Sequence, residues 1–159
     1  MRINSKSSSS ITHLSGLICG VLALATVNLH AAKEPMSKEA LKKEAHFIIS
    51  GKVMALISQV QKSKVERAFG IHSDRVYTIK LKVASVTKGA GVKAGQEILI
   101  EAWQPSTRIP PVPSLQKHGR IPKKGDTVKM YLLKNKEEKV YEPLLPNGIE
   151  IKKGTKKTK

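Results

Sequence analysis

The sequence predicts a mostly β domain, a small barrel of five or six antiparallel strands preceded by a short helix. Two observations predict this class. Apolar and polar residues alternate over residues 76–86, the pattern of a strand with one buried face. The other apolar runs after residue 46 are short and separated by turn residues at hairpin spacing. A β-sandwich is the alternative, but its usual seven strands are hard to place in this sequence.

Residues 1–32 have the three-part layout of a secretory signal peptide. Arg2 and Lys6 give a positive start, residues 14–29 form an apolar run, and small residues follow it. A membrane anchor is the alternative, yet the 16-residue run contains Gly, Thr and Asn, whereas a membrane-spanning helix needs about 20 mostly apolar residues. We therefore expect an exported protein, periplasmic or secreted, cleaved near residue 32 and without a transmembrane segment in its mature form.

The chain after the signal segment is long enough for one domain, which we place at residues 33–151. The only cysteine, Cys19, lies in the signal segment, so neither disulfide nor thiol chemistry is expected. Residues 1–32 hold two of the 29 basic residues and none of the 12 acidic ones, which leaves a net charge of +15. Residues 152–159 contain five lysines and no acid, and such a tail is predicted to be disordered.

The first elements of the domain are a helix and a long strand. Residues 33–46 predict the helix, since Ser37 can cap its N-terminus and apolar residues follow at helical spacing. Residues 47–60 predict the strand, because Gly51 disfavours a helix there and suits a bend. Residues 61–73 form a polar connection, with a short helix as an option near residues 64–69.

The strand at residues 76–86 places Leu81 inside and Lys80 and Lys82 in solvent. Its alternation slips by one residue before Val86, which indicates a β-bulge. Residues 104–124 contain five prolines and no periodicity, so a 21-residue loop is expected there. The remaining segments are turns at residues 88–95 and 135–139 and strands at residues 97–103, 127–133, 140–142 and 148–151.

In their order, these segments resemble bacterial netrin-like domains. Residues 45–53 (AHFIISGKV) are similar to the opening of that family, a helix followed by a strand that ends in Gly-Lys-Val. Residues 77–89 resemble its second strand and V-x-K-G turn, and residues 97–100 its third strand. Residues 124–133 resemble its G-x-x-Y-L-L strand, so the resemblance covers residues 41–133.

Netrin-like domains are OB-fold relatives of the tissue inhibitors of metalloproteinases. The resemblance therefore implies an OB-fold-like barrel. Those inhibitors hold the zinc of their target through an N-terminal cysteine, and the mature form of this chain has no cysteine. The resemblance thus supports the fold and gives no support to protease inhibition.

The sequence contains no motif for catalysis or for a metal. His46, His72 and His118 lie in separate segments without ligand spacing, so we expect them at the surface or in loops. No serine has the surroundings of a catalytic nucleophile, and the glycines at residues 89–95 do not form a phosphate-binding pattern. We therefore expect no enzyme activity, no metal site and no cofactor.

Trp103 stands where the third strand meets the proline-rich segment. Two interpretations remain open. It packs on the core, or it forms a stacking platform beside Arg108, Lys117 and Arg120, because OB-folds use aromatic and basic groups on one face. These four residues are the candidate partner-binding group.

These observations together indicate an exported, soluble, non-enzymatic binding module. The partner is expected to be an anionic polymer, a lipid surface or a protein, and export argues against nucleic acid. The main hypothesis is an anionic partner, because of the net charge of +15. The alternative is a protein-interaction or inhibitor module that acts through the proline-rich loop at residues 104–124.

Overall fold

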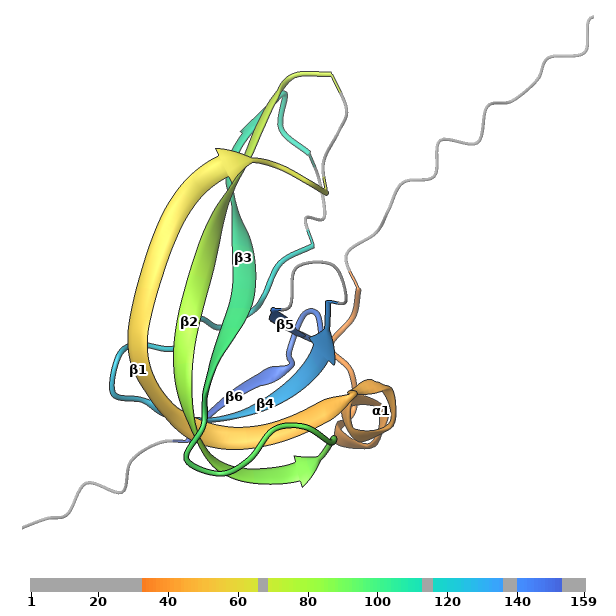
Figure 1. Cartoon of the computed structure of the whole chain (residues 1–159). Helices are drawn as coiled ribbons and strands as arrows, with labels where there is room; N and C mark the ends of the chain where they lie inside the picture. The colour runs from red at the N-terminus through yellow and green to blue at the C-terminus, as the bar shows by residue number, and fades with distance from the viewer. Residues whose placement is uncertain (1–32, 66–68, 113–115, 136–139, 153–159) are drawn as a thin grey trace, which may run out of the picture.

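The structure, a computed structural model, describes residues 33–65, 69–112, 116–135 and 140–152. Within these ranges it is mostly β, with six strands in one mixed sheet and one short helix (Figure 1). The mostly β class predicted from the sequence is confirmed. The signal segment, the C-terminal tail after residue 152 and most of the turn at residues 135–139 lie outside the described residues, as does the middle of the optional helix at residues 64–69.

Helix α1 (Lys38–Glu44) is shorter than the predicted range of residues 33–46, and Ser37 caps it as predicted. The backbone of Ser37 is extended, and its side-chain oxygen accepts a hydrogen bond from the Ala40 N–H at 3.1 Å. Leu41 is buried against a small apolar cluster on the outside of the sheet, together with Ala45, Ile48, Tyr131 and Leu144. Because its buried face is this narrow, the helix depends on the sheet for its stability.

Three long antiparallel strands form most of the sheet: β1 (Phe47–Lys62), β2 (Ile71–Lys88) and β3 (Glu97–Ile109). Each is longer than the sequence predicted. The expected loop at residues 104–124 is wrong over residues 104–109, which continue β3 and pair with β2 as far as Ile71 opposite Ile109. Pro105 fits because the register shifts between Ser73 and Asp74, and proline is tolerated at such bulges.

Strands β4 (Thr127–Lys134), β5 (Tyr141–Pro143) and β6 (Ile149–Lys152) complete the sheet. Strand pairing closes a ring in the order β1–β2–β3–β5–β4–β1, and β6 pairs with β4 beside β5. An odd number of strands in a ring cannot all be antiparallel, so one pair must be parallel. That pair is β3–β5, joined at Ile100 and Tyr141, and the all-antiparallel prediction is wrong there.

The main hydrophobic core lies inside this ring. The alternation of β2 holds: Leu81 is fully buried, and Lys80 and Lys82 are exposed. The predicted bulge is also present, because Ser50 faces Ser85 while Gly51 faces Val83, which leaves Ala84 as the extra residue. Other buried members of the core are Ile49, Val53, Ile79, Val83, Ile98, Ile100, Val128, Met130 and Leu132.

Gly51 is required by the close approach of β1 and β2. A Cβ atom at this position would lie 2.4 Å from the backbone oxygen of Lys82, which is too close for any side chain. The glycine that the sequence marked as a bend is therefore a position where β2 leaves no room for a side chain on β1.

Candidate functional site

The structure engages Arg108 away from the predicted binding group and places Trp103 and Arg120 in different pockets. Arg108 is buried in an ion pair with Asp74, and the two side chains are 7% and 6% exposed. Its guanidinium also donates to the carbonyl oxygens of Ser73 and Thr107. Arg108 is therefore committed to holding β2 and β3 together. The sequence could not show this, because Asp74 lies 34 residues away.

Trp103 is half-buried and joined to His118 through three contacts. The Trp103 N–H donates to Nδ1 of His118 at 3.0 Å, and the His118 N–H donates to the Trp103 carbonyl at 3.1 Å. The two rings meet edge to face with centroids 6.2 Å apart. On its other side, Nε2 of His118 lies 3.0 Å from the Pro143 carbonyl. The imidazole of His118 thus connects the segment after β3 to both β3 and β5.

The expectation that the histidines lie at the surface or in loops is wrong for His72, which is buried in strand β2, whereas His118 lies in a loop segment but is buried there. His118 is only 2% exposed and His72 only 6%, whereas His46 is exposed. No local pattern indicated this, because the partners of His118 are backbone groups 15 and 25 residues away. Since Nδ1 accepts from Trp103, Nε2 carries the proton and donates to Pro143. Burial lowers the pKa of His118 below its ordinary value of 6.5, so the ring is neutral at pH 7.

This arrangement predicts a pH-dependent stability. Below about pH 6.5 the unfolded chain takes up a proton at His118 before the folded protein does, so unfolding becomes more favourable as the pH falls. His118→Gln removes this effect. We expect the stability advantage of the wild type over His118→Gln, measured by urea titration from pH 8 to 5, to shrink by up to about 1.4 kcal/mol per pH unit below pH 6.5. An advantage that stays constant over this range would contradict the neutral imidazole.

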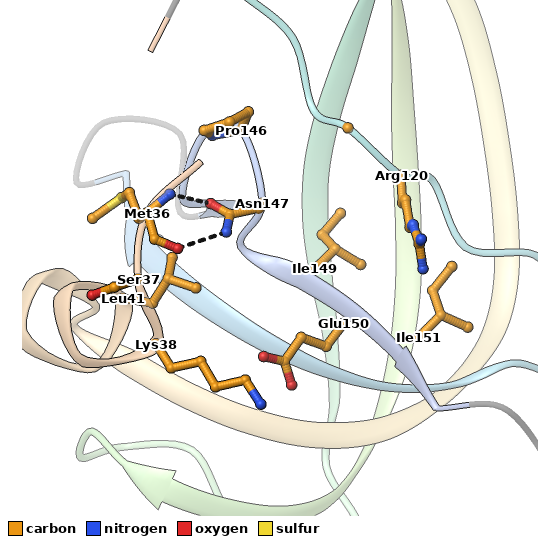
Figure 2. A pocket seen from close by; sticks show the side chains of 11 residues that line it. Met36, Ser37, Lys38, Leu41, Arg120, Pro146, Asn147, Ile149, Glu150 and Ile151 are labelled. Carbon is orange, nitrogen blue, oxygen red and sulfur yellow. Dashed lines mark hydrogen bonds between the residues drawn. The ribbon is translucent and has the colours of Figure 1, made fainter. Parts of the chain in front are cut away.

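Arg120 lines a pocket with a volume of about 730 Å³ (Figure 2). The pocket lies between the start of α1, strand β6 and the segment at residues 119–120. At one end, Asn147 both accepts from the Met36 N–H at 3.0 Å and donates to the Met36 carbonyl at 2.9 Å. Other lining residues are Ser37, Lys38, Leu41, Pro146, Ile149, Glu150 and Ile151.

Charge in this pocket is mixed. Arg120 and Lys38 are cationic, while Glu150 accepts a hydrogen bond from the Tyr131 hydroxyl at 3.3 Å. Trp103 instead lines a smaller pocket of about 200 Å³ with Asp74 and Glu142, and exposed Lys117 lines neither. Arg108 is therefore missing from the predicted platform, whereas Lys117 is next in sequence to His118, the residue that contacts Trp103.

A different basic surface is assembled, on the outer face of the sheet. Lys52 of β1 lies directly opposite Lys82 of β2, and both are exposed. Thr127 of β4 faces Lys52 from the other side and is itself paired with Lys152 of β6. We name Lys52, Lys82 and Lys152 the lysine row. Across the sheet, the register runs Lys152, Thr127, Lys52, Lys82, Glu97.

Acidic groups close to the lysine row in the register have other partners. Glu150, two residues before Lys152 on β6, accepts a hydrogen bond from the Tyr131 hydroxyl. Glu97 pairs with Lys80 at 2.7 Å, and Asp126 accepts from the Lys123 N–H at 2.8 Å in the turn before β4. Among the described residues, no ion pair involves a member of the lysine row. The sequence did not reveal this surface, because its members come from three strands and only the register aligns them.

Comparison with known proteins adds no assignment: the chain matches no protein-family model, no curated protein and no solved structure. Within the part of the chain that the structure describes, no cluster of three or more His, Cys, Asp or Glu side chains could hold a metal ion. Over those same residues, no helix has the length and apolar character to span a bilayer.

Proposed function

We propose that this protein is an exported, non-enzymatic binding module whose partner is anionic and binds at the lysine row. The observation that carries the proposal is the register of the sheet, which sets three exposed lysines in one line without acidic partners among the described residues. The predicted signal segment at residues 1–32 supports export, and the net charge of the rest of the chain, +15, agrees with an anionic partner.

An OB-fold-like barrel of the netrin-like type is the architecture that we propose. Two observations support it: five strands pair in a closed ring, and a short helix packs beside β1 and β4. Both suit the five-stranded, partly open barrel of an OB-fold. The resemblance of residues 41–133 to netrin-like domains points in the same direction.

Two members of the lysine row, Lys52 and Lys82, lie directly opposite one another, and this placement suggests a role. Like charges directly opposite one another on neighbouring strands repel. With strands about 4.8 Å apart, Lys82 and Lys152 are separated by roughly 14 Å across the sheet, with Lys52 between them. A polymer with repeated negative groups matches such a line, and its binding releases counterions. Lys152 also leads directly into the lysine-rich residues 153–159.

The alternative through the proline-rich segment has less support. Residues 104–109 belong to β3, and His118 and Pro122 are buried. Much of the expected loop is therefore part of the fold rather than an exposed binding element.

Replacing the lysine row by glutamine tests the proposal. We expect the triple variant Lys52→Gln, Lys82→Gln, Lys152→Gln to bind dextran sulfate about tenfold more weakly at low salt and to show a shallower salt dependence, because about three phosphate-like contacts are lost. Binding is measured by titration at several salt concentrations.

The matched control removes the same charge from other exposed positions: Lys42→Gln, Lys93→Gln, Lys134→Gln. It should bind nearly as the wild type does. If both triple variants weaken binding equally, the net charge and not the lysine row is responsible, and the proposed site is wrong.

A further inference from the structure

A second surface, at the far end of the long strands, is apolar and exposed. Strands β1, β2 and β3 project beyond the ring as a curved ribbon (Figure 1). At its end Phe69 is 96% exposed, Ile71 65% and Ile109 56%. Ile71 and Ile109 are directly opposite in the β2–β3 register, so their side chains lie next to each other on one face. We name Phe69, Ile71 and Ile109 the ribbon tip.

The backbone beneath the ribbon tip is firmly held. The buried Arg108–Asp74 pair ties β3 to β2 directly below it. The Ser63 N–H donates to the His72 carbonyl at 2.9 Å, and Nε2 of His72 lies 3.2 Å from the Phe69 carbonyl. Phe69 is thus exposed on a backbone that is hydrogen-bonded to its surroundings. A large apolar side chain presented in this way is typical of an interaction site.

Two exposed cations lie near the ribbon tip. Lys62 ends β1 and pairs with Ser73, two residues after Ile71, and Arg75 follows on β2. The carboxylate of Asp74, next to Arg75, is buried with Arg108. Apolar side chains that project from a basic rim match a bilayer of anionic lipids, where the apolar groups enter the acyl region and the cations meet the headgroups.

We propose that the ribbon tip inserts into the surface of an anionic lipid bilayer, with Phe69 as the deepest residue and Lys62 and Arg75 at the headgroups. This surface is separate from the lysine row. Lys62 lies ten residues beyond Lys52 along β1, which corresponds to roughly 33 Å of strand. The inference therefore goes beyond the proposed function and does not depend on it.

The test uses the whole protein with vesicles of phosphatidylcholine alone or mixed with phosphatidylglycerol. In Phe69→Trp we expect the added indole to shift its emission to shorter wavelength and to be quenched by brominated lipid, with anionic vesicles only. The wild type, which has Trp103 alone, gives the background. This local readout is independent of whether residues 1–32 are retained.

Binding itself is measured by co-sedimentation. Phe69→Ser combined with Ile71→Ser should weaken binding to anionic vesicles about tenfold or more. Leu99→Ser, which changes another exposed apolar residue of β3 (48% exposed), should leave binding unchanged. Phe69→Trp introduced into the lysine-row variant should still show the emission shift, so the two proposals can fail separately.

Three results would overturn the bilayer proposal. They are an unshifted emission of the indole added in Phe69→Trp, vesicle binding that survives the Phe69→Ser, Ile71→Ser change, and equal binding to neutral and anionic vesicles. A dimer in the wild type that Phe69→Ser dissociates, with no vesicle binding, would assign the ribbon tip to self-association instead.

Discussion

Leu81→Ala is expected to lower the free energy of unfolding by about 2–5 kcal/mol, because it removes a fully buried side chain and leaves a cavity in the ring. The adjacent Lys80 is the matched control. Its side chain is 46% exposed and pairs with the exposed Glu97, so Lys80→Ala should cost no more than about 1 kcal/mol. A urea titration of each variant at pH 7.5 gives both values.

The contrast between these neighbours tests the alternation of β2 directly. Only a strand with one face inside the ring puts adjacent residues in opposite environments. Equal, small effects at both positions would remove Leu81 from the core and with it the placement of β2.

Asp74→Ala is expected to cost about 3–5 kcal/mol, because Arg108 is then left buried without its carboxylate. Its Nε already lacks a hydrogen-bond partner among the described residues, and the carbonyl oxygens of Ser73 and Thr107 that the guanidinium retains carry no full negative charge to replace the carboxylate. Thermal or urea unfolding measures the loss. Glu97→Ala breaks the exposed pair with Lys80 and is the control, with an expected cost of at most about 1 kcal/mol.

Replacing both partners separates the cost of a lone charge from the value of the pair. Asp74→Leu together with Arg108→Met should recover most of the stability lost in Asp74→Ala, since apolar pairs often substitute well for buried ion pairs. If the double variant is as unstable as Asp74→Ala, packing at this position, rather than the unpaired charge, accounts for the effect.

Most of the fold could be predicted from the sequence because its elements carry local signals. Ser37 capped the predicted helix, Gly51 marked the bend in β1, and the slip before Val86 marked a bulge. The end of β3 was missed because Pro105 and its neighbours disfavour strands locally, whereas pairing with β2 decides the outcome. The parallel β3–β5 pair could not be predicted from a local pattern, because it follows from closing the ring.

The candidate surfaces were less accessible to sequence reasoning. Arg108 was chosen as an exposed cation, but its partner Asp74 becomes visible only when β2 and β3 are paired. The lysine row depends on the register of four strands, which no spacing along the chain reveals. The ribbon tip was missed because Ile71 and Ile109 fall in segments predicted as a polar connection and a loop. Only the pairing of β2 with β3 sets them side by side at an exposed end of the sheet.

The odd number of strands in the ring has a consequence for its motions. The parallel contact between β3 and β5 is one paired position, Ile100 with Tyr141, while every other side of the ring is joined by longer ladders. The β3–β5 contact is therefore the weakest side of the ring, and local opening of the native state should begin with the separation of these two strands. His118 connects the two strands at this contact, because its neutral imidazole hydrogen-bonds to Trp103 on β3 and to Pro143 on β5. Protonation of His118 at low pH should therefore weaken the β3–β5 connection.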